Sequence, residues 1–402
     1  MTSPMSRLSD PSPMIGPAGL IRAAFEGSDM AARAGAILAE AEGGVLEAGT
    51  ALDLATILLL MHRFDEAAQL QAEILRSERY FQLRSNSSEA TTRVLVIATA
   101  GDLMANTPVD FLLNEPRFRV AYLYVLPGED GPDRLPDHDV CIVSVAYSSA
   151  NEPVLEALAS AAERWDRPIV NHPRHVLKTS RHGIADALRG ADGILVPQIV
   201  RLDGSALAAS DYRLPEGLIY PVLVRPIDAH AGNALEKIEG AEALRAYIAQ
   251  SGSATFYVSQ FCDYRGPDGL FRKLRIVLID GTPFLCHMAL RDHWMIHYLN
   301  AGMNEDATKR SAEAMAMAAF DAVFVPRHRK AFAEIHQRTG LDYLILDCAE
   351  SPDGQLLIFE ADTGMIIHDM DPVDLYPYKR PQMHRVFAAF QQAICTRAAH
   401  AI

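Results

Sequence analysis

Three acidic residues near the C-terminus lie on two neighbouring apolar segments. Asp347 lies in LDYLILDC, and Glu360 and Asp362 lie in QLLIFEAD. The turn sequence SPDG between these segments predicts a β-hairpin. Carboxylate oxygens brought together by a hairpin suit Mg²⁺, which commonly bridges protein carboxylates and nucleotide phosphates. We therefore predict a magnesium site; the alternative is that the acids are solvated strand ends.

Basic residues precede this hairpin in a second predicted hairpin, FRKLRIVLIDGTPFLCHMALRD, which turns at Asp280-Gly281. Lys273 and Arg275 occupy alternate positions of its first strand, so both point to one face, and Arg291 follows the second strand. Cations that share a face with bound metal would offset the charge of a triphosphate. The alternative is charge on a solvated sheet face.

Two earlier segments carry further candidate contacts. The segment YPVLVRPIDAHAGNALEKIEG contains a strand that ends near Arg225, a loop of small residues around His230 and Gly232, and an expected helix start. Such loops let backbone N–H groups approach phosphate oxygens. In the next strand and its extension, VSQFCDY, Gln260 and Asp263 could meet adenine and ribose. An ordinary strand-to-helix turn and surface polar groups are the alternatives.

Composition limits the function classes. The chain has 402 residues and is 49% hydrophobic, which suffices for two or three globular domains. Its formal net charge of -14 argues against a general nucleic-acid or anionic-membrane binder, although a local basic pocket can coexist with an acidic exterior.

Cysteine usage and hydropathy suggest a compartment. The five cysteines show no Cys-x-x-Cys spacing and lie mostly in apolar segments, which favours free thiols, a reducing cytoplasmic location and no structural zinc. The N-terminal residues contain proline and serine in place of a signal-peptide core. No segment approaches the roughly 18 apolar residues of a membrane span.

Periodicity and composition divide the chain into successive regions. Alanine and leucine at three- and four-residue intervals predict helices before residue 85, and alternating buried strands and helices predict an open parallel α/β domain after it. The expected fold is α/β and α+β multidomain. Its expected parts are a flexible tail (1–17), a helical domain (18–85), an α/β domain (93–171), and two α+β lobes (172–257 and 258–402).

One unit of the helical region, ALDLATILLLMHRFDEAAQLQAEIL, resembles a tetratricopeptide-like helical hairpin. Its functional interpretation is a surface that binds a peptide or protein partner. The alternatives are a helical cap on an enzyme and a dimerisation element, which would make the protein a homodimer.

In their order along the chain, these motifs resemble the ATP-grasp superfamily over residues 168–394. The resemblance is strongest to glutathione-synthetase-like carboxylate-amine ligases, including enzymes that add glutamate to a ribosomal protein. It implies a two-lobed fold that clasps ATP, Mg²⁺ on the last hairpin, and an acyl phosphate that an amine attacks to give an amide. Small amino acids, peptides or proteins would supply the carboxylate and the amine.

The resemblance also implies roles for individual residues. Arg181 in KTSRHG and Arg225 would contact phosphates where the family usually has lysine, and arginine retains the charge with a different geometry. Asp362 stands where the family commonly has asparagine. The remaining implied contacts are Arg275 and Arg291 with the γ-phosphate and acyl phosphate, Gln260 and Asp263 with adenosine, Asn300 at a polar position, and Asp347 and Glu360 with the metal.

Two other functions remain open at this point. An ATP-grasp kinase would use the same clasp for phosphotransfer without ligation. A nucleotide-binding scaffold without turnover is suggested by the two arginines that replace lysines.

Overall fold

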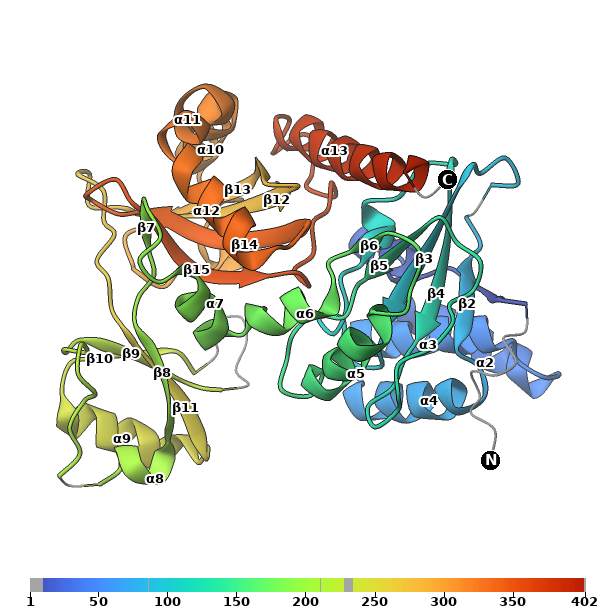
Figure 1. Ribbon diagram of the computed structural model, residues 1–402, viewed down its shortest axis with the longest axis horizontal. Coiled ribbons are helices and arrows are strands. Elements are labelled where there is room, and N and C mark those ends of the chain that lie inside the picture. The colour runs from blue at the N-terminus through green and yellow to red at the C-terminus, as the bar shows by residue number, and fades with distance from the viewer. Residues whose placement is uncertain (1–9, 86, 210, 228–233, 401–402) are drawn as a thin grey trace. The chain divides into compact units, whose positions relative to one another are not determined.

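The structure is a computed structural model that describes residues 10–85, 87–209, 211–227 and 234–400. The chain forms two compact units (Figure 1). The first unit consists of Met1–Leu177, Leu341–Tyr343 and Asp362–Ile402, and the second consists of Lys178–Gly340 and Leu344–Ala361. Among the described residues, no helix is both long enough and apolar enough to cross a membrane.

The first unit is built around a six-stranded sheet with the order β1-β2-β4-β3-β5-β6. The central strands β4, β3, β5 and β6 run parallel, as the alternation of strands and helices predicts, whereas β2 is antiparallel to β4. The strands are β1 (Ser12–Met14), β2 (Tyr80–Leu83), β3 (Thr92–Ala98), β4 (Phe118–Tyr124), β5 (Val140–Val143) and β6 (Ile169–Val170). The helix α5 (Glu152–Ala162) connects β5 and β6.

The first two strands in the order of this sheet, β1 and β2, correct the expected boundary of the helical region. Ser12–Met14, expected within a flexible tail, pairs in parallel with Tyr80–Leu83, expected at the end of a helix. Burial explains the difference, because the side chains of Met14, Phe81 and Leu83 enter the core. The N-terminal helices are therefore joined to the α/β sheet by its own edge strands.

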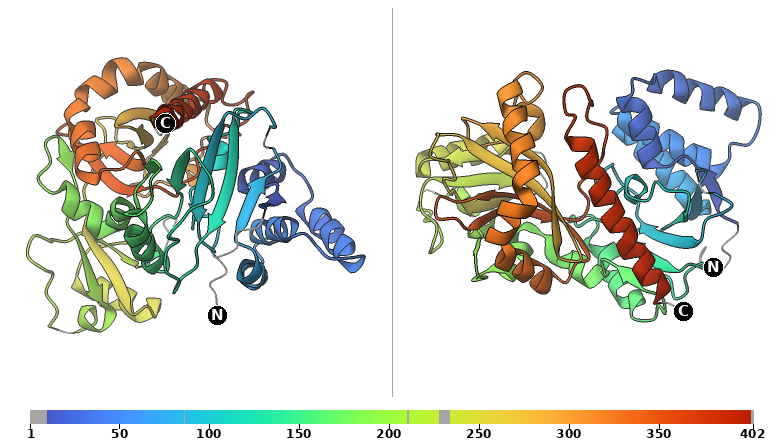
Figure 2. Two further views of the ribbon diagram at one scale, coloured as in Figure 1. Left: turned by 45° about the vertical axis from the view of Figure 1, so that its right-hand side comes forward. Right: turned by 90° about the horizontal axis from the view of Figure 1, so that it is seen from above.

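Four helices separate β1 from β2, and Figure 2 shows them gathered beside this sheet. They are α1 (Pro17–Phe25), α2 (Met30–Glu42), α3 (Ala48–Leu60) and α4 (Phe64–Ser77). The helix α3 is buried along most of its length and packs against α4, as the predicted helical hairpin requires. One hairpin does not establish a tetratricopeptide array.

The second unit contains a four-stranded antiparallel sheet with the order β10-β9-β11-β8. Its strands are β8 (Ile199–Asp203), β9 (Val222–Pro226), β10 (Glu236–Ile238) and β11 (Thr255–Gln260), with helices α8 (Gly204–Leu207) and α9 (Ala241–Ser251). The residues EKI, where we expected a helix to begin, instead form β10 against β9. The helix follows at Ala241, after Gly240.

A second, five-stranded sheet in this unit has the order β13-β12-β14-β15-β7. Its strands are β7 (Ile194–Leu195), β12 (Phe271–Ile279), β13 (Thr282–Arg291), β14 (Tyr343–Glu350) and β15 (Leu356–Asp362). Both predicted hairpins are confirmed, and Asp280 and Gly281 have φ angles of 48° and 77° at the first turn. This geometry suits a type I′ turn.

Helices pack on and beside this second sheet. The helix α10 (Ala307–Ala319) contacts β13 and continues through a π-helical turn, η5 (Phe320–Phe324), into α11 (Val325–Arg327) and then α12 (Arg329–Thr339). The helix α7 (Arg181–Leu188) contacts both α12 and β8, so it connects the two sheets of this unit.

The chain returns to the first unit after β15. There Thr107 donates a hydrogen bond from Oγ1 to the carbonyl of Thr363 at 2.7 Å. The long helix α13 (Lys379–Ala399) then places Gln391, whose Nε2 donates to the carbonyl of Leu112 at 2.8 Å. The expected second lobe, 258–402, is thus divided between the two units.

A buried carboxylate in the first unit gives a test of the packing under α1. Ala18 N donates to Oδ2 of Asp110 at 2.7 Å, while burial raises the pKa of Asp110 to about 6. The raised pKa means that the folded state favours the protonated form of Asp110. The stability that the protonated carboxyl group contributes is therefore present below about pH 4 and is lost as the pH rises past about 6. A shift of this size corresponds to about 3 kcal/mol.

We therefore expect the free energy of unfolding of the wild type, minus that of Asp110→Asn, to fall by about 3 kcal/mol between pH 3.5 and pH 7. Urea denaturation at several pH values measures this difference. Parallel pH profiles for the two proteins would contradict the burial of this carboxylate.

Candidate functional site

Asp347, on the middle strand β14 of the five-stranded sheet, is held by two cations from the neighbouring strand β12. Arg275 donates from Nε to Oδ1 at 2.8 Å and from Nη2 to Oδ2 at 3.1 Å. Lys273 Nζ lies 2.7 Å from Oδ2. The alternation of β12 places both cations on one face, as the sequence predicted, and the structure adds that both reach the same carboxylate.

The carboxylate is buried and the cations are more accessible. The side chain of Asp347 is 4% exposed, whereas the side chains of Lys273 and Arg275 are 21% and 22% exposed. Burial alone would raise the pKa of Asp347, but the charges of Arg275 and Lys273 outweigh it and hold that pKa well below its ordinary value. The carboxyl group is therefore ionised and paired.

A second ion pair joins α7 to β15. Arg181, at the first position of α7, donates from Nη2 to Oε1 of Glu360 at 2.7 Å. Ser180 begins this helix and accepts a hydrogen bond from Gly183 N at 3.1 Å, which fixes the first turn that carries Arg181. Glu360 retains 32% exposure of its side chain.

Arg225, near the end of the apolar strand β9, is a buried cation. It is 7% exposed, and its Nε and Nη2 have no hydrogen-bond partner among the described residues. Burial, followed by the charge of Arg181, lowers the pKa of Arg225 to about 10. Buried polar groups normally find partners, so a guanidinium in this state can accept an anion as its partner.

Together these residues form a cluster in the second unit that we call the cation site, namely Arg181, Arg225, Lys273 and Arg275 with the acids Asp347 and Glu360. Four cations accompany two carboxylates, so the site has excess positive charge. A nearby imidazole responds to this charge, because burial, Lys273 and Arg275 lower the pKa of His297. An excess of cations of this kind suits an anion with several charges.

The predicted magnesium ligands do not fit a three-carboxylate metal site in this arrangement. Both oxygens of Asp347 are bound by cations, and Oε1 of Glu360 is bound by Arg181. Oδ1 of Asp362 accepts hydrogen bonds from the backbone N–H groups of Thr363 and Gly364 at 2.6 and 3.2 Å. Among the described residues, no group of three acidic, histidine or cysteine side chains is arranged to hold a metal ion.

The predicted adenosine contacts are engaged by the protein itself. Oε1 of Gln260 accepts from Ile219 N at 2.9 Å, and its Nε2 donates to the carbonyls of Pro221 and Phe261 at 3.3 and 3.1 Å. Gln260 therefore orders the backbone around the end of β11. The direct adenine contact from this side chain stays a prediction, for which Oε1 has one further lone pair.

The predicted ribose contact, Asp263, is likewise paired. Nε of Arg265 donates to both of its carboxylate oxygens at 3.0 Å. This hydrogen-bonded arginine lowers the pKa of Asp263. A ribose would have to compete with an exposed ion pair, which is worth little on its own.

Sequence reasoning missed an aromatic and cationic group beside Gln260. Lys237 of β10 places its Nζ 4.4 Å from the ring centroid of Phe261, and the ring of Trp294 meets Phe261 edge to face at 5.9 Å. Such groups can contact a planar heterocycle and a phosphate tail. The signal in the sequence was the aromatic residue directly after Gln260.

The other predicted residues have varied outcomes. His230 and Gly232 lie outside the described residues. Arg291 is the last residue of β13, where it pairs with Phe271 of β12. Lys273 of β12 pairs with Ala289, which lies two residues before Arg291 on β13. The side chain of Asn300 accepts from His297 N at 3.0 Å and so caps a short turn.

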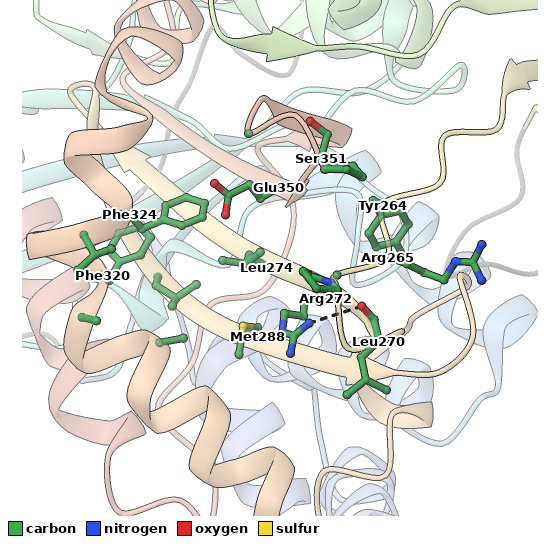
Figure 3. Close-up of a pocket in the computed structure, with 18 residues that line it drawn as sticks. Tyr264, Arg265, Leu270, Arg272, Leu274, Met288, Phe320, Phe324, Glu350 and Ser351 are labelled. Carbon is green, nitrogen blue, oxygen red and sulfur yellow. Dashed lines mark hydrogen bonds between the residues drawn. The ribbon is translucent and has the colours of Figure 1, made fainter.

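A cavity of about 610 Å³ lies over the opposite face of β12 (Figure 3). Leu274, Leu285 and Met288 line it from the sheet, and Phe320 lines it from the π-helical turn. Its arginines are already paired, because Arg265 binds Asp263 and Arg272 binds Asp268. The cavity therefore lies apart from the cation site, on the other face of β12.

No protein-family model and no curated protein matches this chain. Similar solved structures include a RimK domain ATP-grasp protein from Sphaerobacter thermophilus (16% identity, 75% of this chain, 99% of that chain, TM-score 0.41). They also include the VanG D-Ala:D-Ser ligase from Enterococcus faecalis (11% identity, 76% of this chain, 99% of that chain, TM-score 0.46). A third is a D-alanine–D-alanine ligase from Bacillus anthracis (12% identity, 77% of this chain, 98% of that chain, TM-score 0.45).

The first of these structures carries the name of the superfamily that the sequence resembles, and the other two are named as ligases. Their TM-scores are too low for the superpositions to assign an activity to this chain, so the case for function rests on the cation site.

The pairing of Asp347 predicts a specific pattern of stability. Arg275→Met leaves a buried carboxylate with one of its two cations, and we expect it to lower the free energy of unfolding by about 3 kcal/mol. Asp347→Asn in the same background removes the uncompensated charge and should recover part of this loss. Urea denaturation of both single variants and the double variant measures the coupling; additive effects would contradict the pairing.

Proposed function

We propose that the protein is an ATP-dependent carboxylate-amine ligase that forms an amide through an acyl-phosphate intermediate. The observation that carries the proposal is the buried guanidinium of Arg225, which lacks a hydrogen-bond partner on two of its nitrogens. Holding it beside Arg181 is unfavourable without an anion, because burial and like charge both oppose ionisation. A polyphosphate chain is an anion with enough charge to pair with the whole cation site.

The arrangement also suits the chemistry of phosphoryl transfer. Such a reaction needs mainly positioning and stabilisation of charge on the transferred group, which fixed cations supply. Lys273 and Arg275 lie on a strand within a sheet, and their donors are oriented by Asp347. Rigid placement of this kind avoids reorganisation when charge develops on the phosphate oxygens.

In the proposed reaction, a carboxylate oxygen of the first substrate attacks the γ-phosphorus of ATP, and ADP leaves. The resulting acyl phosphate is attacked at its carbonyl carbon by the amine of the second substrate. Phosphate leaves, the nitrogen loses a proton, and an amide is formed. We assign Arg181, Arg225, Lys273 and Arg275 to the phosphates, and we route no step through a metal ion because the predicted ligand set does not fit one.

The order of the motifs supports the use of ATP at this site. The strand with Arg225, the segment with Gln260, the cationic hairpin and the acidic hairpin follow each other as in the ligases that the sequence resembles. We propose amino acids or a peptide as substrates, with the α3–α4 hairpin as a candidate surface for a peptide. Free cysteines fit the proposed reducing, cytoplasmic compartment.

A screen for ADP release over amino acids and short peptides, with mass detection of products, tests the proposal. We expect an amide product from the wild type. Arg225→Met should lower kcat/KM by about 10²-fold or more, because it removes a cation from the phosphate site. The matched control is Arg272→Met, since Arg272 lies on the other face of β12 and pairs with Asp268.

Other outcomes of this screen identify the alternatives. A stable phosphorylated product without an amide would show a kinase. Nucleotide binding without turnover over the whole substrate panel would support a scaffold. Equal activity of Arg225→Met and the wild type would contradict the proposed phosphate site.

A further inference from the structure

We infer that Asp347 is a positioning residue that holds Lys273 and Arg275 toward the phosphates, and that Lys273 supplies the positive charge that a divalent cation on Asp347 would otherwise supply. The inference rests on the proposed function, because it concerns how the same site binds a polyphosphate. Its consequence is that polyphosphate binding at this point needs no metal ion.

Both carboxylate oxygens of Asp347 are occupied by protein cations. Arg275 Nε is bonded to Oδ1, while Lys273 Nζ and Arg275 Nη2 both approach Oδ2 within 3.1 Å. Both oxygens of Asp347 therefore have a cationic partner. A divalent ion placed in contact with either oxygen would also be close to two positive groups, which repel it.

The carboxylate of Asp347 is poorly accessible to a metal ion. Mg²⁺ demands near-ideal octahedral geometry and usually keeps several waters, so it needs an open carboxylate. Asp347 is instead covered, with 4% of its side chain exposed, while the two cations each keep about a fifth of theirs exposed. A ligand that reaches this part of the sheet meets the ammonium and guanidinium groups before it meets the acid.

Lys273 and Arg275 keep N–H donors that do not contact Asp347. An ammonium has three N–H donors, and the contact with Asp347 uses one of them. The guanidinium of Arg275 is bound to Asp347 through Nε and Nη2, so Nη1 takes no part in the pair. Lys273 and Arg275 thus retain donors for phosphate oxygens while their stems are held in place.

The sheet holds Lys273, Arg275 and Asp347 at fixed positions. Lys273 and Arg275 are two residues apart on β12, and Asp347 lies on β14, the strand next to it. Their separation is therefore fixed by strand spacing and side-chain alternation, which is a rigid support for two charges. A flexible loop would not hold two cations at a set distance.

Calorimetric titration with tripolyphosphate and with ATP, each in EDTA and in Mg²⁺, tests the inference on the full chain. We expect the wild type to bind tripolyphosphate in EDTA with a Kd within about fivefold of that in Mg²⁺, because protein cations provide the charge. Lys273→Met should weaken binding in EDTA by about tenfold or more, and Mg²⁺ should restore part of the loss, because Oδ2 of Asp347 then keeps Arg275 as its one cationic partner. Lys273→Arg, which keeps the charge, should bind in EDTA nearly as well as the wild type.

A merely structural role for Lys273 would weaken binding equally with and without metal. Such equal weakening would overturn the inference, as would a wild type that binds tripolyphosphate only in Mg²⁺. The wild-type titrations in EDTA and in Mg²⁺ need no variant, so they test the inference even if Lys273→Met fails to fold. Arg272→Met is the control and should behave as the wild type.

The same titrations separate this inference from the proposed function. If ATP binds only in Mg²⁺, the inference fails and the ligase proposal survives. If neither ATP nor tripolyphosphate binds the wild type under either condition, both fail.

Discussion

The buried carboxylate of Asp347 determines the orientation of the cationic face of the five-stranded sheet. Without it, Lys273 and Arg275 would be two long side chains that repel each other and sample many conformers. With it, both are fixed at 2.7 to 3.1 Å from a common anion, and their remaining donors are available to a ligand. The acid that looks like a metal ligand in the sequence thus organises protein charge in the structure.

The site also contains two like charges, Arg225 and Arg181, which come from a strand and a helix. Arg225 comes from β9 of the four-stranded sheet, and Arg181 comes from the first turn of α7, which contacts both β8 and α12. Glu360 compensates only Arg181 directly, at 2.7 Å. The unfavourable burial of Arg225 is what an anionic ligand would relieve, so the free energy stored there favours binding.

Much of this arrangement was accessible from the sequence. Alternation placed Lys273 and Arg275 on one face, Asp-Gly marked the turn of their hairpin, and the pattern of buried strands predicted the α/β sheet. Spacing could not show that Asp347 binds the cations, because a carboxylate on a strand has the same pattern whether it meets a metal or a lysine. The strand at Ser12–Met14 was also missed, since three residues beside proline give no periodic signal and their pairing with Tyr80–Leu83 is distant in sequence. Lys237 was missed for a similar reason, because β10 is only three residues long.

The central claim is that Arg181, Arg225, Lys273 and Arg275 form one polyphosphate site. A crystal structure of the protein with a non-hydrolysable ATP analogue tests it most directly. The account predicts that the β- and γ-phosphate oxygens lie within hydrogen-bonding distance of Arg225 and of Lys273 or Arg275, with the ion pairs to Asp347 intact. An analogue found with its phosphates elsewhere, or with a metal ion bound to Asp347 in place of Lys273, would contradict it.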